Sequence, residues 1–111
     1  MAYSTQEVAL GTVTVATAAT QYSTVWDALD VTQGVVQATW KDLSHGDGTV
    51  TLQYSLDGTN YNSYATATTM SATPGAKFWE ITVLGRFYRV AVAKVSNTAG
   101  TVTIRAIGKH A

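Results

Sequence analysis

The chain has 111 residues, 46% hydrophobic and only 13% charged, which is enough for one domain built around one packed core. Seven basic residues balance seven acidic ones, and a neutral chain of this kind predicts no nucleic-acid partner and no attachment to a membrane surface. The sequence contains no cysteine, which excludes disulfides, thiolate metal sites and cysteine nucleophiles.

The predicted elements are strands throughout. Threonine, alanine and valine supply 48 of the 111 residues, and the branched Cβ of threonine and valine suits a pleated, half-buried surface. Apolar and polar residues alternate with the period of a strand, and no helical stripe accompanies them. In chain order the alternating runs are 12–15, 25–31, 36–41, 50–56, 79–83, 88–92 and 101–106.

Parity within each run predicts which side chains face the core. The predicted core is Val36, Ala38, Trp40, Val50, Leu52, Tyr54, Trp79, Ile81, Val83, Tyr88, Val90, Val92, Val102 and Ile104. In the run 25–31, Val25, Leu29 and Val31 share one parity, which places Trp26 on the opposite, outer face.

Turn residues separate these runs. Asp57-Gly58 predicts a tight hairpin, and 44–48 and 97–100 predict two further turns. The segment 65–72 fits either an edge strand or an ordered loop. We therefore expect an all-β fold, a two-sheet antiparallel β-sandwich of about seven to eight strands, with jelly-roll or immunoglobulin-like connectivity. Residues 1–111 form this single domain, and residues 1–10 are a candidate N-terminal arm that lies on a neighbouring subunit.

His45, with Asp42 and Asp47 nearby, is the most site-like polar group. It could form a small metal site or a base with an orienting carboxylate, but a polar hairpin tip built by Gly46 and Gly48 is favoured, because a metal needs more convergent ligands. His110 is expected to be solvated. Without a recognisable catalytic motif, an enzyme has the least support, and we expect no cofactor and no metal.

Four aromatic residues are candidate contacts to a partner or a glycan. Trp40 and Trp79 share the parity of the core, whereas the outward parity of Trp26 and Phe87 predicts an interface. Tyr61 and Tyr64 follow the Asp57-Gly58 turn. The candidate contacts are therefore Trp26, Tyr61, Tyr64 and Phe87.

Charge divides unevenly along the chain. Residues 1–76 hold six acids and Lys41, a net charge of −5, whereas residues 77–111 hold six basic residues and Glu80, a net charge of +5. Neighbouring strands of one sheet could neutralise this division, or it could provide complementary patches for head-to-tail or ring assembly.

Several motifs together resemble a known group of proteins. An alternating strand, then Ser55-Leu56-Asp57-Gly58, then Tyr61 form a recurrent hairpin, and 84–90 and 100–106 are similar to paired closing strands. With the strand 37–40, this set resembles small β-sandwich structural proteins of tailed bacteriophages over about residues 35–108. A weaker similarity is to discoidin or galactose-binding jelly rolls.

The resemblance implies a non-enzymatic virion protein, of the capsid decoration, head-fibre or neck/tail type. Its expected partners are copies of itself and other virion structural proteins of the capsid, neck or tail. The alternative is a carbohydrate-binding module whose exposed aromatics contact host surface glycans.

Overall fold

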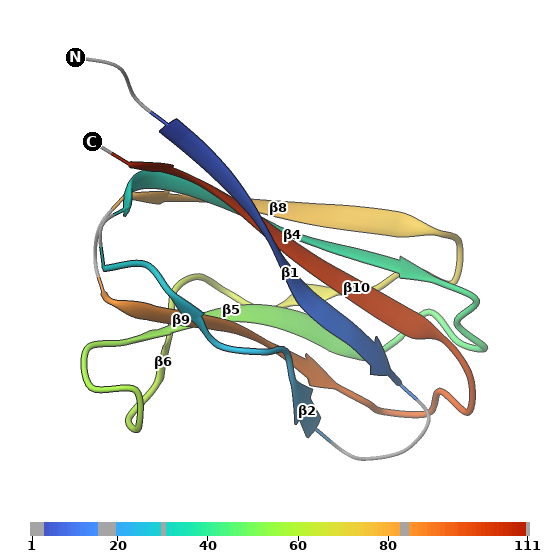
Figure 1. The fold of residues 1–111 in the computed structure, drawn as a ribbon. Helices are drawn as coiled ribbons and strands as arrows, with labels where there is room; N and C mark the ends of the chain where they lie inside the picture. The colour runs from blue at the N-terminus through green and yellow to red at the C-terminus, as the bar shows by residue number, and fades with distance from the viewer. Residues whose placement is uncertain (1–3, 16–19, 30, 83–84, 111) are drawn as a thin grey trace.

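The computed structural model describes residues 4–15, 20–29, 31–82 and 85–110 and contains two antiparallel β-sheets packed face to face (Figure 1). Within these ranges there is no helix, and hence none that could cross a membrane. The predicted all-β, two-sheet antiparallel sandwich is confirmed.

The four-stranded sheet has the order β1-β10-β4-β8. Its members are β1 (Ser4–Thr14), β10 (Thr101–His110), β4 (Val31–Lys41) and β8 (Gly75–Thr82). Strand β1 pairs with β10 from Ser4 opposite His110 to Thr14 opposite Thr101, with a bulge between Ala9 and Thr12. Of the candidate arm, residues 1–10, the part from residue 4 onward is thus paired within the chain, and residues 1–3 lie outside the described ranges.

The six-stranded sheet has the order β2-β9-β5-β6, with two further strands attached. Its members are β2 (Thr20–Tyr22), β9 (Phe87–Ala93), β5 (Thr49–Ser55), β6 (Asn62–Ser63), β3 (Trp26–Asp27) on β9 and β7 (Thr68–Thr69) on β5. The strand total exceeds the prediction because four of these elements are only two or three residues long. The segment 65–72 combines both expectations, since β7 is an edge strand and the rest is loop.

The core lies between the sheets and follows the predicted parity in the long strands. Leu52 on β5 and Ile104 on β10 are both 0% exposed, as the register requires. The other predicted core residues are buried as well, apart from Tyr54, which is half-buried against the core, and Val83, which lies outside the described residues.

Trp26 is in the core, so the prediction that it faces outward is wrong. Its side chain is 6% exposed, whereas Val25 and Leu29 are 43% and 62% exposed. The parity argument assumed that inward and outward side chains alternate without interruption through residues 25–31. They do not, because the strand β3 is only two residues long. The indole packs against paired Gly34 and Gly108 of β4 and β10. A Cβ on either glycine would lie about 3 Å from its ring.

The Asp57-Gly58 turn is wider than the predicted tight hairpin. Strand β5 ends at Ser55 and β6 begins at Asn62, so the connection spans residues 56–61. Among the residues of this loop only Gly58 has a positive φ, of 79°. The Asp57 carboxylate accepts hydrogen bonds from the backbone N–H groups of Thr59 and Asn60, both at 2.8 Å. These bonds, with the side chains of Asn60 and Ser55, lower the pKa of Asp57 far below its usual range.

Candidate interaction surface

A cluster of side chains crosses the outer face of the six-stranded sheet, and we call it the Arg89 clamp. It consists of Tyr22 on β2, Arg89 on β9, Gln53 on β5 and Tyr61 just before β6. The guanidinium carbon of Arg89 lies 3.9 Å from the ring centroid of Tyr22 and 3.8 Å from that of Tyr61. Its Nε donates a hydrogen bond of 2.8 Å to Oε1 of Gln53.

Strand register brings the clamp together. Gln53 and Arg89 are direct partners in the β5–β9 pair, and Tyr22 pairs with Ala91, one outward position farther along β9. Since outward residues on one strand are two apart, the Tyr22 ring reaches Arg89 diagonally. The cation–π contacts hold the guanidinium plane in a fixed orientation.

Phe87 lies two residues before Arg89 on the same strand and extends this surface. Its ring is half-buried, with the guanidinium carbon of Arg86 at 4.9 Å from the centroid. Arg86 also makes two hydrogen bonds to the Asp27 carboxylate, at 2.9 and 3.0 Å. The hydrogen bond from Arg86 holds the pKa of Asp27 below its usual value.

Of the four predicted contact residues, the structure brings Tyr61 and Phe87 to this surface, buries Trp26 in the core and places Tyr64 half-buried against the core. Tyr64 packs edge-on against Tyr54, with ring centroids 6.1 Å apart, and its hydroxyl donates to the backbone oxygen of Glu80 on the other sheet. The ring centroids of Trp26 and Tyr88 lie 6.1 Å apart.

The sequence reasoning missed Tyr22 and Arg89. Arg89 was recognisable as the outward residue between Tyr88 and Val90. Tyr22 carried no signal, because β2 has three residues and no period to read.

The polar residues around His45 have a structural role, because they hold loops together. Residues 42–48 connect β4 of the four-stranded sheet to β5 of the six-stranded sheet. The chain crosses here from one sheet to the other, so the expected hairpin is not formed. Asn97, 0% exposed, accepts a hydrogen bond of 2.8 Å from the His45 backbone and donates to the Asp47 carboxylate at 3.0 Å. The hydroxyl of Ser96 also donates to Asp47 and lowers the pKa of this carboxyl group. The described residues include no group of three metal-ligating side chains.

Two other polar candidates, Asp42 and His110, take no part in these hydrogen bonds among the described residues. Asp42 is exposed and has a φ of 61°. The side chain of His110 lies outside the described residues.

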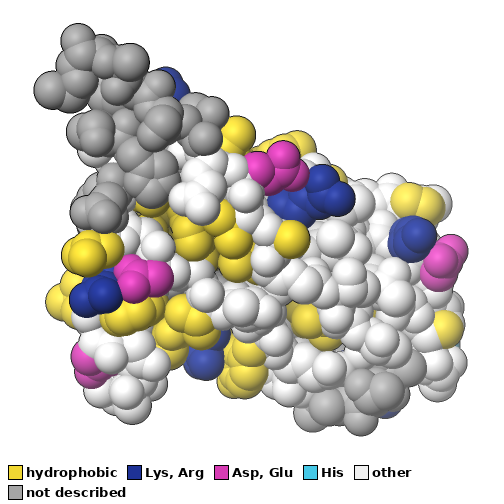
Figure 2. All heavy atoms as spheres, viewed as in Figure 1, with side chains coloured by type: hydrophobic (Ala, Val, Ile, Leu, Met, Phe, Trp, Pro, Cys, Tyr) yellow, Lys and Arg dark blue, Asp and Glu magenta, His cyan; other side chains and the backbone are white. Residues whose placement is uncertain are grey.

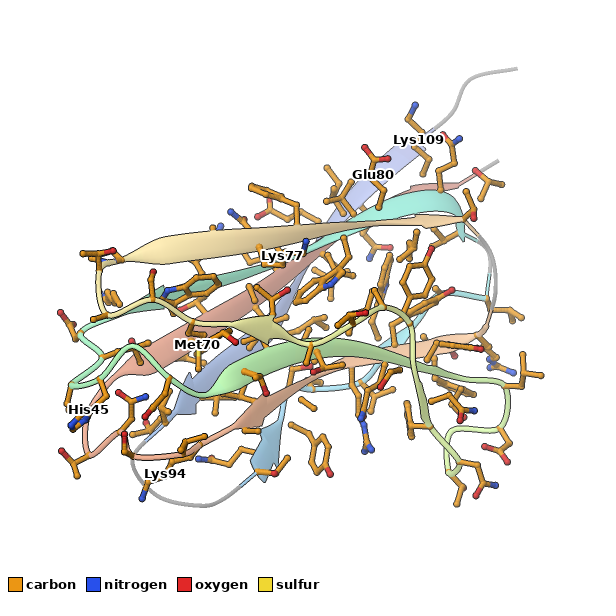
Figure 3. The ribbon with its side chains drawn as sticks, turned by 180° about the vertical axis from the view of Figure 1, so that it is seen from behind. His45, Met70, Lys77, Glu80, Lys94 and Lys109 are labelled. Carbon is orange, nitrogen blue, oxygen red and sulfur yellow. The ribbon has the colours of Figure 1, made fainter. Side chains whose placement is uncertain are left out.

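A second feature lies on the opposite broad face of the sandwich. The outer side of the four-stranded sheet is hollowed by a cavity of about 380 Å³ at the beginning of β4 and the ends of β8 and β10. Gly34, Val35, Ile107 and Gly108 are among its lining residues, together with the charged residues Glu80 and Lys109. Figure 3 shows Glu80 and Lys109 projecting from the sheet on the side away from the core.

The surface between these features is largely neutral. Charged side chains are scattered among neutral ones on the face drawn in Figure 2, several of them as neighbouring acidic and basic groups. Among the residues that the structure describes, Arg86 and Asp27 form an ion pair, as do Arg105 and Glu7, with nitrogen–oxygen distances of 2.9 and 3.1 Å. The pair Arg105–Glu7 joins two neighbouring strands of one sheet, because β1 pairs with β10. Such pairing within a sheet was one of the two expectations for the uneven charge of the chain.

The fold defines the class of protein as a two-sheet β-sandwich, and it occurs among solved structures. The chain is similar to the structure titled "Crystal structure of PBSX exported protein XepA", with a TM-score of 0.71 and 16% sequence identity. That similarity covers 96% of this chain, which spans 38% of the length of the solved chain. A structure titled "CBM4 structure and function" aligns with a TM-score of 0.44 and 14% identity over 80% of this chain and 73% of its own. No family model matches the sequence, and no curated protein does.

Proposed function

We propose that the chain is a non-enzymatic structural protein of a bacteriophage virion, of the capsid decoration, head-fibre or neck/tail-associated type. In this role it binds a protein lattice as a homo-oligomer. The observation that carries the proposal is the fold shared over 96% of the chain with an exported protein of the phage PBSX. The phage-like motifs in residues 35–108 support the same origin. Of the two connectivities left open, we infer the jelly roll, because long strands adjacent in each sheet are distant in the sequence.

The outer face of the four-stranded sheet suits a contact with another protein chain in such an assembly. Thr12, Thr103 and Thr39 lie side by side across β1, β10 and β4, and the hydroxyl oxygens of the first two are 3.4 Å apart. Neutral hydroxyl groups can bond to a partner without the desolvation cost of burying charges.

The acidic side chains support a non-catalytic role. Hydrogen bonds lower the pKa of Asp27, Asp47 and Asp57, so all three remain carboxylates at neutral pH. A general acid or base works best when its pKa lies near the working pH. These three groups instead stabilise loops and an ion pair.

Mass spectrometry of purified phage particles tests the virion role. We expect the chain in particles produced by cells that carry its gene, at a fixed copy number set by the symmetry of the lattice. Its absence from complete particles would contradict the proposal.

A carbohydrate-binding module is the second candidate, and the exposed Tyr22 ring favours it. This ring is 49% exposed beside a guanidinium and an amide, groups that can hold a sugar ring and its hydroxyls. Binding on a glycan array that disappears in Tyr22→Ala and Tyr61→Ala would establish it. Leu56→Ala, which changes an exposed side chain of a nearby loop, is the control.

A further inference from the structure

Arg89 is half-buried, yet none of the described carboxylates forms an ion pair with it. Tyrosine rings cover its two faces, and Gln53 occupies its Nε. Within the described ranges no hydrogen-bond acceptor faces its two Nη atoms, so their N–H groups can bind a further acceptor. A planar fork of N–H donors, held rigidly, fits a carboxylate best.

Most acidic side chains of the chain are already engaged. Glu7 and Asp27 are in ion pairs, and Asp47 and Asp57 accept hydrogen bonds within their own loops. Asp30 lies outside the described residues. The carboxylates of Asp42 and Glu80 have no hydrogen-bond or ion-pair partner in the part of the chain that the structure describes.

Glu80 combines a free carboxylate with an apolar neighbourhood. It lines the hollow on the outer face of the four-stranded sheet, with Val35 as its direct partner on β4 and Ile107 next to Val35 on β10. Ile107 is 44% exposed, and Phe78, two residues before Glu80, is 59% exposed. These side chains offer apolar surface to the tyrosines of an Arg89 clamp. Asp42 lies in the connection after β4, outside this hollow.

We propose that copies of the chain stack face to face, with the Arg89 clamp of one copy bound to Glu80 of the next. The inference rests on the proposed structural role and names the surfaces that would build the homo-oligomer. Because the two surfaces lie on opposite faces of one sandwich, the contact is heterologous and repeats as a ring or a column. The molecule extends 48 × 27 × 20 Å, so a broad face exceeds the roughly 800 Å² per partner of a standard interface.

Lys109 lines the same hollow and carries the same charge as Arg89. In the stack it would oppose the approach of the clamp. Its replacement should therefore strengthen association, which is the opposite of what a general loss of surface charge would predict.

Charge reversal tests the stack in sedimentation velocity experiments on the purified chain over a range of concentrations. We expect R89E and E80R each to weaken self-association by about tenfold or more, and Lys109→Gln to strengthen it. The double variant R89E/E80R should restore association, and so should an equimolar mixture of the two single variants, since each supplies the charge that the other lacks. Lys41→Glu, an exposed reversal at the far end of β4, is the control.

Folding of each variant is checked by circular dichroism, and the exposed Glu80 keeps the test decisive if R89E does not fold. A wild-type chain that stays monomeric at every concentration would overturn the stack. Association unchanged in E80R would also overturn it. The chain could still occur in purified particles in either case, so failure of the stack is distinguishable from failure of the virion role.

Discussion

Gly108→Ala tests the account of how Trp26 enters the core. A Cβ at residue 108 would lie 2.9 Å from Cζ2 of Trp26 and 3.0 Å from both Cγ atoms of Val31. Distances this short force side chains to shift, and overpacking of this kind costs about 1–3 kcal/mol. The lower entropy of the unfolded chain returns about 0.4–1 kcal/mol. We therefore expect a net loss of about 1–2 kcal/mol, and a Tm lower by roughly 4–8 °C.

Urea denaturation of four proteins measures this loss: wild type, Gly108→Ala, Trp26→Phe and the double variant. Phenylalanine lacks the outer ring atoms nearest to the added methyl group, so the alanine should cost less in that background. If Gly108→Ala is as stable as the wild type, the close packing of the indole on the glycine pair is not what excludes a side chain there. An equal cost in both backgrounds would assign the clash to Val31 instead.

Two further predictions concern the core and the widest loop. Leu52→Ala should lower the free energy of unfolding by about 2–5 kcal/mol, because the side chain is fully buried between the sheets. Urea denaturation measures this loss, and a value below about 1 kcal/mol would contradict the place of Leu52 in the core. The pKa of Asp57 is lower in the folded than in the unfolded chain, so its contribution to stability is present above the unfolded value of about 3.9 and is lost as pH falls through the folded value. Thermal melts between about pH 5 and pH 2 should therefore show a smaller decrease in Tm for Asp57→Asn than for the wild type, and equal decreases would contradict it.

Sequence parity predicted the interior wherever a strand was long enough to repeat its pattern. Leu52, Val90 and Ile104 lie in strands of seven to ten residues, and one register error would have turned each set outward. Between residues 20 and 29 the strands have two or three residues. There the position of Trp26 depends on the pairing of Gly34 with Gly108, which lie 74 positions apart.

The candidate surface was less accessible to sequence reasoning than the core. Tyr61 could be selected from its place after a turn and Phe87 from its outward parity, but what joins them is Arg89. The two tyrosine neighbours of Arg89, Tyr22 on β2 and Tyr61 just before β6, are 39 positions apart in the sequence. Such a cluster exists only once the sheet order β2-β9-β5-β6 is known. Composition and period do not encode that order.

The pairing of β1 with β10 has a consequence for how the protein is made. On the ribosome, β1 is synthesised long before its partner β10, since Ser4 pairs with His110. The four-stranded sheet therefore cannot close until β10 has been synthesised, because β10 lies between β1 and β4. Until then β4 has only β8 beside it, and the apolar side of β1 is exposed to other nascent chains. Folding that depends on such distant pairing is slow, so the yield of native protein should depend on how well the cell protects the unfinished sheet.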